Sequence, residues 1–363
     1  MSRRGENIYK RKDGRWEGRY KVGQDDKGRT KYHSVYAKSY QEVKKKLAVM
    51  KFTPVQHKNA GNLTVYTLFE EWMSAVKLKV KASTYANYRM KVDKHILPEF
   101  GKIKYEDLTA QMIHSFIQNK LNNGLSAKYV SDIVIVFKSM AKYISIVHEF
   151  QNPIANVVLP KAKKKEMVLL TEEQQKHLCG HLLQDMNTTS LGVMLSLYTG
   201  LRIGEVCGLK WSDIDFGKCV LSVNRSVQRI RNINGNSATK LLISTPKSET
   251  SKRSIPLPTF LIKFLQKFRG VSTAYVLSGS DKVIEPRTMQ YRFKTILKKA
   301  NLPSINYHSL RHIFATNSIK AGFDIKTLSE LLGHATVETT LNRYVHSSIE
   351  RKIECMNLLQ LVA

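Results

Sequence analysis

The N-terminal part of the chain alternates hydrophobic and polar positions with a period of two. Residues 16–22 place Trp, Gly, Tyr and Val in turn with Glu, Arg and Lys, and residues 32–36 repeat the alternation through Tyr, Ser and Tyr. An Asp-Gly pair at 13–14 is a strong hairpin signal. The Ser-Tyr-Gln-Glu sequence at 39–42 is a capping box that opens a helix. This pattern predicts a small unit of three strands and one helix.

Residues 64–156 change to a helical period, in which apolar residues recur at intervals of three and four. Pro98 is predicted to stop the second helix, because proline lacks the backbone N–H that a helix interior needs. The stretch as a whole predicts a compact four-helix domain. Its helices are expected to begin near Val65 and to span 83–96, 109–121 and 126–147.

The remaining residues mix both patterns. Thr-Glu-Glu-Gln at 171–174 is a second capping box, and Asp324 is predicted to cap another helix. Gly200 and Gly333 are predicted C-terminal caps, because glycine adopts the left-handed conformation readily. The tail, 347–363, carries apolar residues at near-helical spacing that need a surface to cover them. Strands are predicted at 219–223, 241–244 and 253–256, and helices at 286–300 and 308–321.

Two stretches without periodicity divide the chain. Residues 52–62 read as a linker, and the run of proline and lysine at 160–166 marks a second boundary. The predicted fold class is therefore a multidomain α+β protein. A three-stranded sheet with a helix occupies 1–55, a helical domain 64–156, and a mostly α-helical domain with a small antiparallel sheet 166–363.

Composition adds a strong positive charge. Lys and Arg number 59 against 29 Asp and Glu, a net charge of +30, and the surplus is spread over all three predicted domains. Basic surface along a folded chain favours a long polyanion as partner, although a ribosome-associated or membrane-surface protein shares this property. The sequence has no apolar signal segment, no apolar run of membrane-spanning length and no paired cysteine spacing. We therefore expect a cytoplasmic protein with no membrane association.

Basic residues in three places are candidates for DNA contact. A small sheet that offers Arg, Lys and Tyr on one face can enter a major groove, although a docking domain would look the same. The lysines around the first helix-helix turn of 64–156 are either a DNA-facing rim or a solvated face, and the lysine run after Pro160 is either a DNA contact or a hinge. The candidates are Arg15, Arg19, Lys21, Lys81, Arg89, Lys91, Lys94, Lys161, Lys163 and Lys164.

Six residues of the last domain form a coherent set for phosphoryl transfer to a tyrosine. Two guanidinium groups can hold the non-bridging oxygens of a phosphodiester. A tyrosine hydroxyl, with an ordinary pKa of about 10, needs a base or a cationic field, which a histidine or the arginines can supply. A lysine can protonate the departing sugar oxygen. The six are Arg202, Lys247, His308, Arg311, His334 and Tyr344.

No cofactor or metal is expected. His177 and His181 have a spacing that superficially resembles zinc ligands, but no partner pair is evident and Gly180 weakens the helix that would present them. A glycine-rich phosphate loop ending in Lys-Ser or Lys-Thr is absent from the sequence, so nucleotide hydrolysis has no support.

Four motifs, in order and in residue type, resemble the tyrosine recombinases of the lambda integrase family. They are Arg-Ile-Gly-Glu at 202–205, Pro-Lys-Ser at 246–248, His-Ser-Leu-Arg-His at 308–312, and the Leu-Gly-His to Tyr block at 332–344. Residues 64–156 are similar to the family's helical core-binding domain. Residues 7–50 are similar to the arm-binding sheet of integrases from conjugative transposons and phages.

The resemblance implies a role for each member of the site. Arg202, Arg311 and His334 are expected to hold the scissile phosphate. Lys247 is expected to protonate the leaving 5′ oxygen and His308 to shuttle protons. Both follow from the family pattern.

The resemblance further implies that Tyr344 forms a 3′-phosphotyrosine link and that Glu205 supports the site. The function so implied is site-specific DNA recombination for integration and excision of a mobile element. The expected partners are double-stranded DNA with core and arm sites, a homotetramer on that DNA, and an accessory directionality protein. The alternatives are DNA relaxation by a type IB topoisomerase-like enzyme and a DNA-binding structural protein without catalysis.

Overall fold

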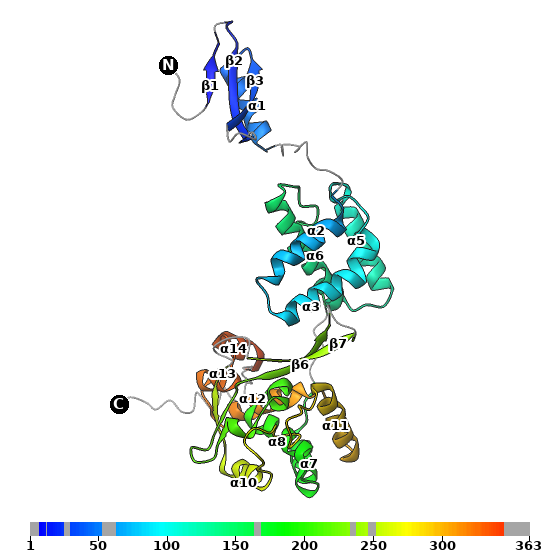
Figure 1. Cartoon of the computed structure of the whole chain (residues 1–363), viewed down its shortest axis with the longest axis vertical. Helices are drawn as coiled ribbons and strands as arrows, with labels where there is room; N and C mark the ends of the chain where they lie inside the picture. Colours follow the sequence, from blue (N-terminus) through cyan, green and yellow to red (C-terminus); the bar gives the residue numbers. More distant parts are fainter. Residues whose placement is uncertain are drawn as a thin grey trace, which may run out of the picture. The chain divides into compact units, whose positions relative to one another are not determined.

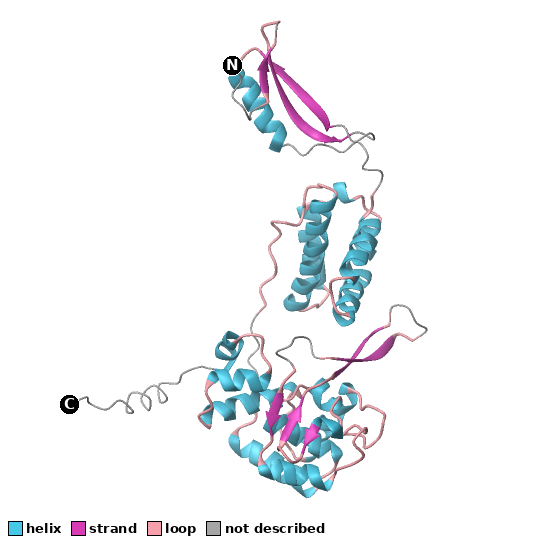
Figure 2. Cartoon of the chain, turned by 60° about the vertical axis from the view of Figure 1, so that its left-hand side comes forward, coloured by secondary structure: helices cyan, strands magenta, loops and turns pink. Residues whose placement is uncertain are grey.

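The computed structural model describes residues 7–11, 13–24, 30–52, 63–162, 168–232, 237–245 and 252–344. The chain forms two compact units, Met1–Lys163 and Lys164–Ala363. The first contains a small sheet with a helix and a group of helices, and the second is mostly helical with short antiparallel strands (Figures 1 and 2). The predicted α+β class is confirmed.

The N-terminal sheet has the predicted three strands in the order β1-β2-β3, all antiparallel, and a helix covers one face (Figure 2). Ile8 and Val35 of the sheet are buried against Val43 and Leu47 of the helix. Gly18 is required there, because a Cβ atom at that position would lie 2.5 Å from Leu47 Cδ1. The elements are β1 (Ile8–Lys10), β2 (Trp16–Gln24), β3 (Thr30–Ala37) and α1 (Tyr40–Phe52).

The helical part of the first unit begins at Thr64, whose side chain caps the first helix. The helices predicted to start at Thr109 and Ser126 begin one residue later, and these two residues are their N-caps. Pro98 does not stop the second helix. A π-helical turn precedes it, so Pro98 enters at the start of a new turn, where no N–H is needed. The elements are α2 (Val65–Lys77), α3 (Ala82–Lys91), a π turn (Val92–Ile96), α4 (Leu97–Phe100), a 3₁₀ turn (Tyr105–Asp107), α5 (Ala110–Asn122) and α6 (Ala127–Val147).

The strands of the second unit differ from the prediction. β4 (Ile214–Asp215), β5 (Val220–Ser222) and β8 (Ser254–Pro256) form one sheet, while β6 (Ser226–Arg231) and β7 (Thr239–Ser244) form a separate hairpin. The predicted strand at 241–244 therefore does not pair with the other two. β4 and β6 were not predicted, because β4 has two residues and the buried residues of β6 are spaced by three.

Helices lie around this sheet (Figure 2), and most residues of α8 are buried. The predicted caps at Gly200 and Gly333 are confirmed, with φ values of 65° and 63°. Among the described helices, none has the length and apolar character needed to cross a membrane. The helices are α7 (Glu172–Gln184), α8 (Thr188–Thr199), α9 (Ile203–Cys207), a 3₁₀ turn (Trp211–Asp213), α10 (Thr259–Lys267), α11 (Pro286–Lys299), α12 (His308–Lys320), α13 (Ile325–Leu332) and α14 (Val337–Tyr344).

Candidate active site

Arg202 and Glu205 form the first part of the site, at the beginning of α9. The Arg202 backbone N–H donates to Glu205 Oε2 at 2.9 Å, and its Nη1 donates to Oε1 at 2.9 Å. Glu205 is thus both the capping partner of a short helix and the counter-ion of Arg202. The carboxylate is buried, whereas 36% of the Arg202 side chain stays exposed and accessible to an anion.

A second arginine shares the same carboxylate. Arg253 donates from Nη2 to Glu205 Oε2 at 2.9 Å and from Nη1 to Oε1 at 3.3 Å. Its side chain is 5% exposed. Sequence reasoning did not single out Arg253. Glu205 was expected to support the site, but no sequence pattern indicated that a second arginine would bind it.

Arg311 lies within α12 and is the largest fully buried side chain among those described. Its Nη1 donates to the carbonyl of Gly200 at 2.7 Å and its Nη2 to the carbonyl of Leu332 at 2.6 Å. The two glycine caps are therefore part of the site, because they direct the helix-terminal carbonyls toward this guanidinium.

Three successive carbonyls at the end of α13 each accept from a different arginine. Arg253 Nε donates to Leu331 at 2.6 Å, Arg311 to Leu332, and Arg202 Nη2 to Gly333 at 3.2 Å. The last carbonyls of a helix have no partner within the helix, and the negative end of the helix dipole favours cations there. The end of α13 consequently holds three guanidinium groups together beside the His334 turn.

His334 follows directly after Gly333, as predicted. Its Nδ1 lies 2.8 Å from Thr340 Oγ1, so α14 orients the imidazole that precedes it. The Tyr344 ring stacks against the His334 ring, with centroids 6.3 Å apart and planes 3° apart. The Tyr344 hydroxyl oxygen is buried at the site.

Histidines of α12 complete this row of rings. The His312 ring lies 5.3 Å from the Tyr344 ring and 4.9 Å from the His308 ring. His308 is exposed, while His312 is buried. The contact of His312 with the tyrosine was not predicted, although His312 belongs to a quoted motif.

Among its described side chains, the site carries more positive than negative charge, with three guanidiniums against one carboxylate. Burial raises the pKa of Glu205, but Arg253 and Arg202 more than offset this, so the pKa lies below its usual range. Burial and the like charges of Arg202 and Arg253 lower the pKa of Arg311 to about 9, which leaves it charged at neutral pH. Such a cluster is suited to an anionic ligand.

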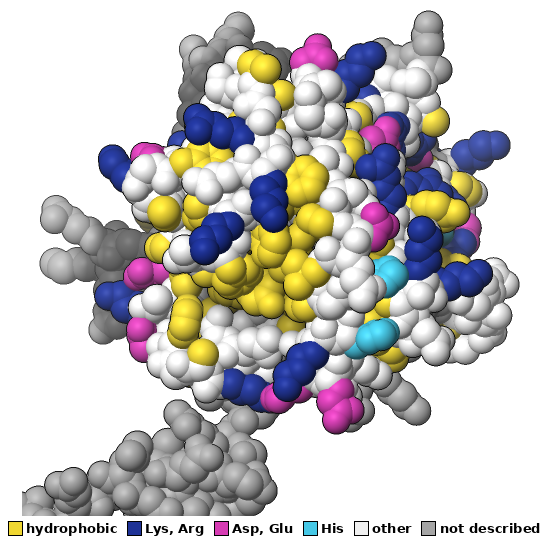
Figure 3. All heavy atoms as spheres, turned by 90° about the horizontal axis from the view of Figure 1, so that it is seen from below, with side chains coloured by type: hydrophobic (Ala, Val, Ile, Leu, Met, Phe, Trp, Pro, Cys, Tyr) yellow, Lys and Arg dark blue, Asp and Glu magenta, His cyan; other side chains and the backbone are white. Residues whose placement is uncertain are grey.

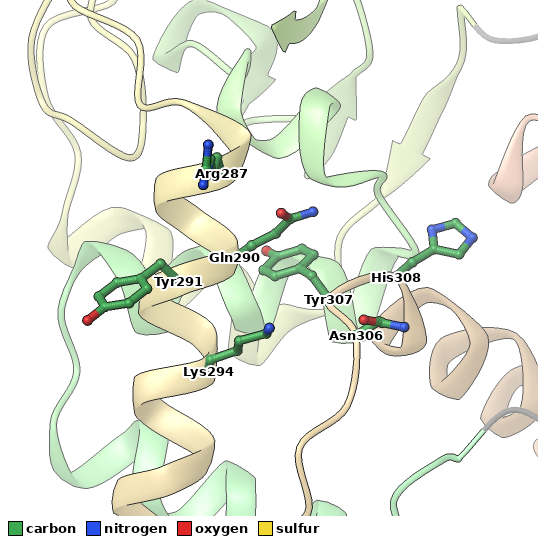
Figure 4. Close-up of a pocket in the computed structure, with 7 residues that line it drawn as sticks. All are labelled: Arg287, Gln290, Tyr291, Lys294, Asn306, Tyr307 and His308. Atoms are coloured by element: carbon green, nitrogen blue, oxygen red, sulfur yellow. The ribbon is translucent and has the colours of Figure 1, made fainter. Parts of the chain in front are cut away.

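A cavity of about 430 Å³ lies beside His308. Figure 4 shows Gln290 and Lys294 of α11 directed toward Tyr307 and Asn306, with Arg287 nearer the start of the helix. The Tyr307 hydroxyl donates to the Gly192 carbonyl at 3.0 Å, so the floor of the cavity is fixed. The opening offers amide and cationic groups next to the predicted proton shuttle.

The described residues bring together five of the six predicted site residues, Arg202, His308, Arg311, His334 and Tyr344, around the ends of α8 and α13. Lys247 lies outside the described residues. His177 Nε2 lies 3.0 Å from the Ala300 carbonyl and so donates to it. Across the described ranges, no group of three or more His, Cys, Asp and Glu residues could hold a metal ion.

Of the DNA-contacting residues predicted for the N-terminal part, Arg15 and Arg19 are exposed and ion-paired. Arg15 Nη2 lies 2.8 Å from Asp13 Oδ2, and Arg19 Nε lies 2.8 Å from Glu17 Oε1. The side chain of Lys21 is outside the described part.

In the helical part, Lys81 and Lys94 are exposed, whereas Lys91 is buried and Arg89 is engaged by Glu70. Lys91 is therefore not on an exposed rim, whereas Arg89 is partly exposed. Arg89 also pairs with Asp93 and stacks over an aromatic ring. In the third stretch, Lys161 is exposed, and Lys163 and Lys164 are not among the described residues.

Comparison with known protein families decides the classification. The description "Phage integrase family" matches residues 168–351, which contain the whole candidate site. The description "Phage integrase, N-terminal SAM-like domain" matches residues 64–122. The chain belongs to the phage integrase family. The expected tyrosine recombinase class is thereby confirmed.

Similar proteins of known class are also tyrosine recombinases or integrases by name. A "Tyrosine recombinase XerC-like" protein of Caldanaerobacter subterraneus subsp. tengcongensis is 26% identical over 93% of this chain and 94% of its own length. The "ICEBs1 integrase" of Bacillus subtilis is 24% identical over 81% of this chain and 82% of its own.

Two solved structures share the fold. The Tn1549 transposon integrase in complex with a circular intermediate DNA aligns with a TM-score of 0.67 at 22% identity, covering 82% of this chain and all of that one. A lambda integrase dimer bound to a core site aligns with a TM-score of 0.60 at 17% identity, covering 96% and 100%.

Proposed function

We infer that this tyrosine recombinase cuts and rejoins double-stranded DNA at specific sites, and that it integrates and excises a mobile element. One observation carries the proposal. Arg202, Arg311 and His334, far apart in the sequence, meet at the end of α13, where the Tyr344 ring stacks on His334. This arrangement supplies anion-holding groups and a nucleophile in one place.

In the proposed reaction, Arg202, Arg311 and His334 hold the non-bridging oxygens of the scissile phosphate. The Tyr344 oxygen attacks phosphorus and its proton passes to His308, while the bond from phosphorus to the 5′ oxygen breaks. Lys247 gives the leaving 5′ oxygen its proton. The result is a 3′-phosphotyrosine link, which conserves the phosphodiester bond.

His308 and Glu205 support this step without binding the phosphate. His308 moves protons at the opening toward the cavity, and Glu205 keeps Arg202 in place through two hydrogen bonds. A second DNA strand with a free 5′ hydroxyl reverses the reaction and completes strand exchange. The chain's own cations meet the charge of the transition state, so no metal or cofactor is part of the proposal.

The domain roles follow the same proposal. Residues 64–156 bind core-site DNA, with Lys81 and Lys94 the candidate contacts that the structure leaves exposed. Residues 1–55 bind arm-type DNA through Arg15, Arg19 and Lys21, and residues 166–363 hold the catalytic site and an exchange tail. Four copies assemble on the DNA in the cytoplasm, and an accessory protein sets the direction.

The proposed tail contact has a candidate surface. On the face seen in Figure 3, hydrophobic side chains gather in a hollow. In the same unit, Phe260 is 40% exposed, and its ring lies 4.8 Å from Tyr198 and 6.5 Å from Phe264. We expect the apolar tail, 347–363, of a neighbouring copy to cover such a surface. Truncation before residue 347 should abolish tetramers on DNA, and a truncated protein that still forms them would refute this role.

Strand exchange between two duplexes that carry the DNA flanking the gene tests the function. The unaltered protein should yield recombinant duplexes, and Tyr344→Phe should bind the same DNA without yielding any. Relaxation of a supercoiled plasmid without recombinant product would instead favour the topoisomerase alternative.

A further inference from the structure

Arg253 connects two segments that carry proposed catalytic groups. Its Nη atoms bind both oxygens of Glu205, the carboxylate that also holds Arg202. Its Nε donates to Leu331, three residues before His334. In the chain it stands six positions after Lys247. One buried guanidinium therefore binds both the Arg202 segment and the end of the helix that precedes His334.

We propose that Arg253 is a positioning residue for DNA cleavage, which fixes Arg202 and the His334 turn through Glu205 and Leu331. The proposal rests on the recombinase function proposed above. It assigns Arg253 no contact with the DNA, because its side chain is 5% exposed whereas that of Arg202 is 36% exposed.

The geometry explains why an arginine is needed. A guanidinium is planar and has N–H groups on three nitrogens, so it can bind two carboxylate oxygens on one edge and a carbonyl on another. Arg253 uses all three nitrogens in this way. A lysine keeps the charge but has a single nitrogen, and it cannot hold both Glu205 and Leu331 in the same geometry.

The shared carboxylate also sets how Arg202 is held. Glu205 Oε1 accepts from Arg202 Nη1 at 2.9 Å and from Arg253 Nη1 at 3.3 Å. With Arg253 removed, Glu205 keeps its two hydrogen bonds from Arg202 but loses those from the second guanidinium, so both Arg202 and the His334 turn can shift. A displacement of about 1 Å at a catalytic group can slow a reaction by about 10²-fold.

A merely structural arginine makes a different prediction, and the chain offers a matched control. Arg225 Nη1 binds Asp213 Oδ2 at 2.5 Å, a second partly buried arginine–carboxylate pair in the same unit. The Arg225 guanidinium donates hydrogen bonds to Asp213 and to the Gly208 carbonyl. Neither of these partners is a proposed catalytic residue. Loss of stability is common to both variants, but loss of positioning is specific to Arg253.

The experiment uses the full-length protein and a nicked duplex, made from the DNA flanking the gene, that traps the covalent adduct. We would measure the single-turnover rate of adduct formation at saturating DNA, the Kd for the duplex, and the melting temperature. The variants are Arg253→Gln, Arg253→Lys, Arg225→Gln, Glu205→Gln and the double variant of Arg253→Gln with Glu205→Gln.

We expect Arg253→Gln to slow adduct formation by about 10²-fold while the Kd changes by less than about threefold. Arg253→Lys should restore only part of the rate, and Arg225→Gln should lower the melting temperature without slowing the step. The double variant should be slowed by less than the product of the two single effects, because Arg253 and Glu205 share one contact, although Arg253 also holds Leu331 independently of Glu205.

The result that overturns the inference is a normal rate in Arg253→Gln, or an equal slowing in Arg225→Gln. If Arg253→Gln does not fold, Arg253→Lys decides in its place: a slowed rate with unchanged Kd supports the role, and a normal rate refutes it. Absence of any adduct with the unaltered protein would overturn the proposed function itself, so the two failures are distinct.

Discussion

Replacing Glu205 by glutamine tests the charge arrangement that the site depends on. The carboxylate is 4% exposed and binds two guanidiniums, so Glu205→Gln removes a negative charge that two arginines share. Removing one partner of a buried ion pair costs about 3–5 kcal/mol. We expect the free energy of unfolding of the second unit to fall by about that amount at pH 7.

The pH dependence gives a sharper test. The folded-state pKa of Glu205 lies below its ordinary value of 4.5. A carboxylate with a depressed pKa contributes stability that is fully present above the unfolded value and is lost as pH falls through the folded value. The difference in free energy of unfolding between the unaltered protein and Glu205→Gln should therefore be constant above about pH 4.5 and should shrink below it.

Amide hydrogen exchange of α8 and α12 in the full-length protein measures this free energy, because slowly exchanging core amides report unfolding of their own unit. Glu285→Gln is the control, since Glu285 pairs with Arg229 at a more exposed place and exposed pairs contribute little. The reasoning would be refuted if the free energy of unfolding fell no more in Glu205→Gln than in the control. It would also be refuted if that decrease did not change with pH.

Three further outcomes follow from the site. Thr340→Val removes the hydroxyl 2.8 Å from His334 Nδ1 and should slow DNA cleavage by up to about 10²-fold with little change in DNA affinity; an unchanged single-turnover rate would contradict the orienting role. Lys247→Ala should slow cleavage of ordinary DNA by about 10²–10⁴-fold but should matter little when a 5′-bridging sulfur is the leaving atom; equal defects on both substrates would remove the general-acid role. Deletion of residues 1–55 should abolish binding to arm-type DNA and leave binding to core-site DNA, as gel-shift titrations would show, and loss of neither would make this part a docking domain.

Local signals in the sequence predicted much of the fold. The capping box at Thr171 and the left-handed glycines at 200 and 333 mark the ends of helices, because their chemistry acts within one turn. The prediction that Pro98 ends a helix was wrong for a related reason. It considered only the missing N–H of proline, and the sequence does not reveal the π turn that accommodates this proline.

The residues of the site likewise fall into those that the sequence predicted and those that it did not. Residues with chemistry of their own, such as Arg311, His334 and Tyr344, were predicted from type and order. Arg253 was not, because its importance lies in contacts with Glu205 and Leu331, which are 48 and 78 residues away in the chain. The tertiary fold creates those contacts, and no local sequence pattern predicts them.

The most direct test of the account is the identity of the covalent link. The unaltered protein would react with a nicked duplex from the DNA flanking the gene, be digested with nuclease and protease, and be analysed by mass spectrometry. The account predicts one modified peptide, with a nucleotide attached through its 3′ phosphate to Tyr344, and none from Tyr344→Phe. A nucleotide on another residue, or attached through a 5′ phosphate, would contradict it.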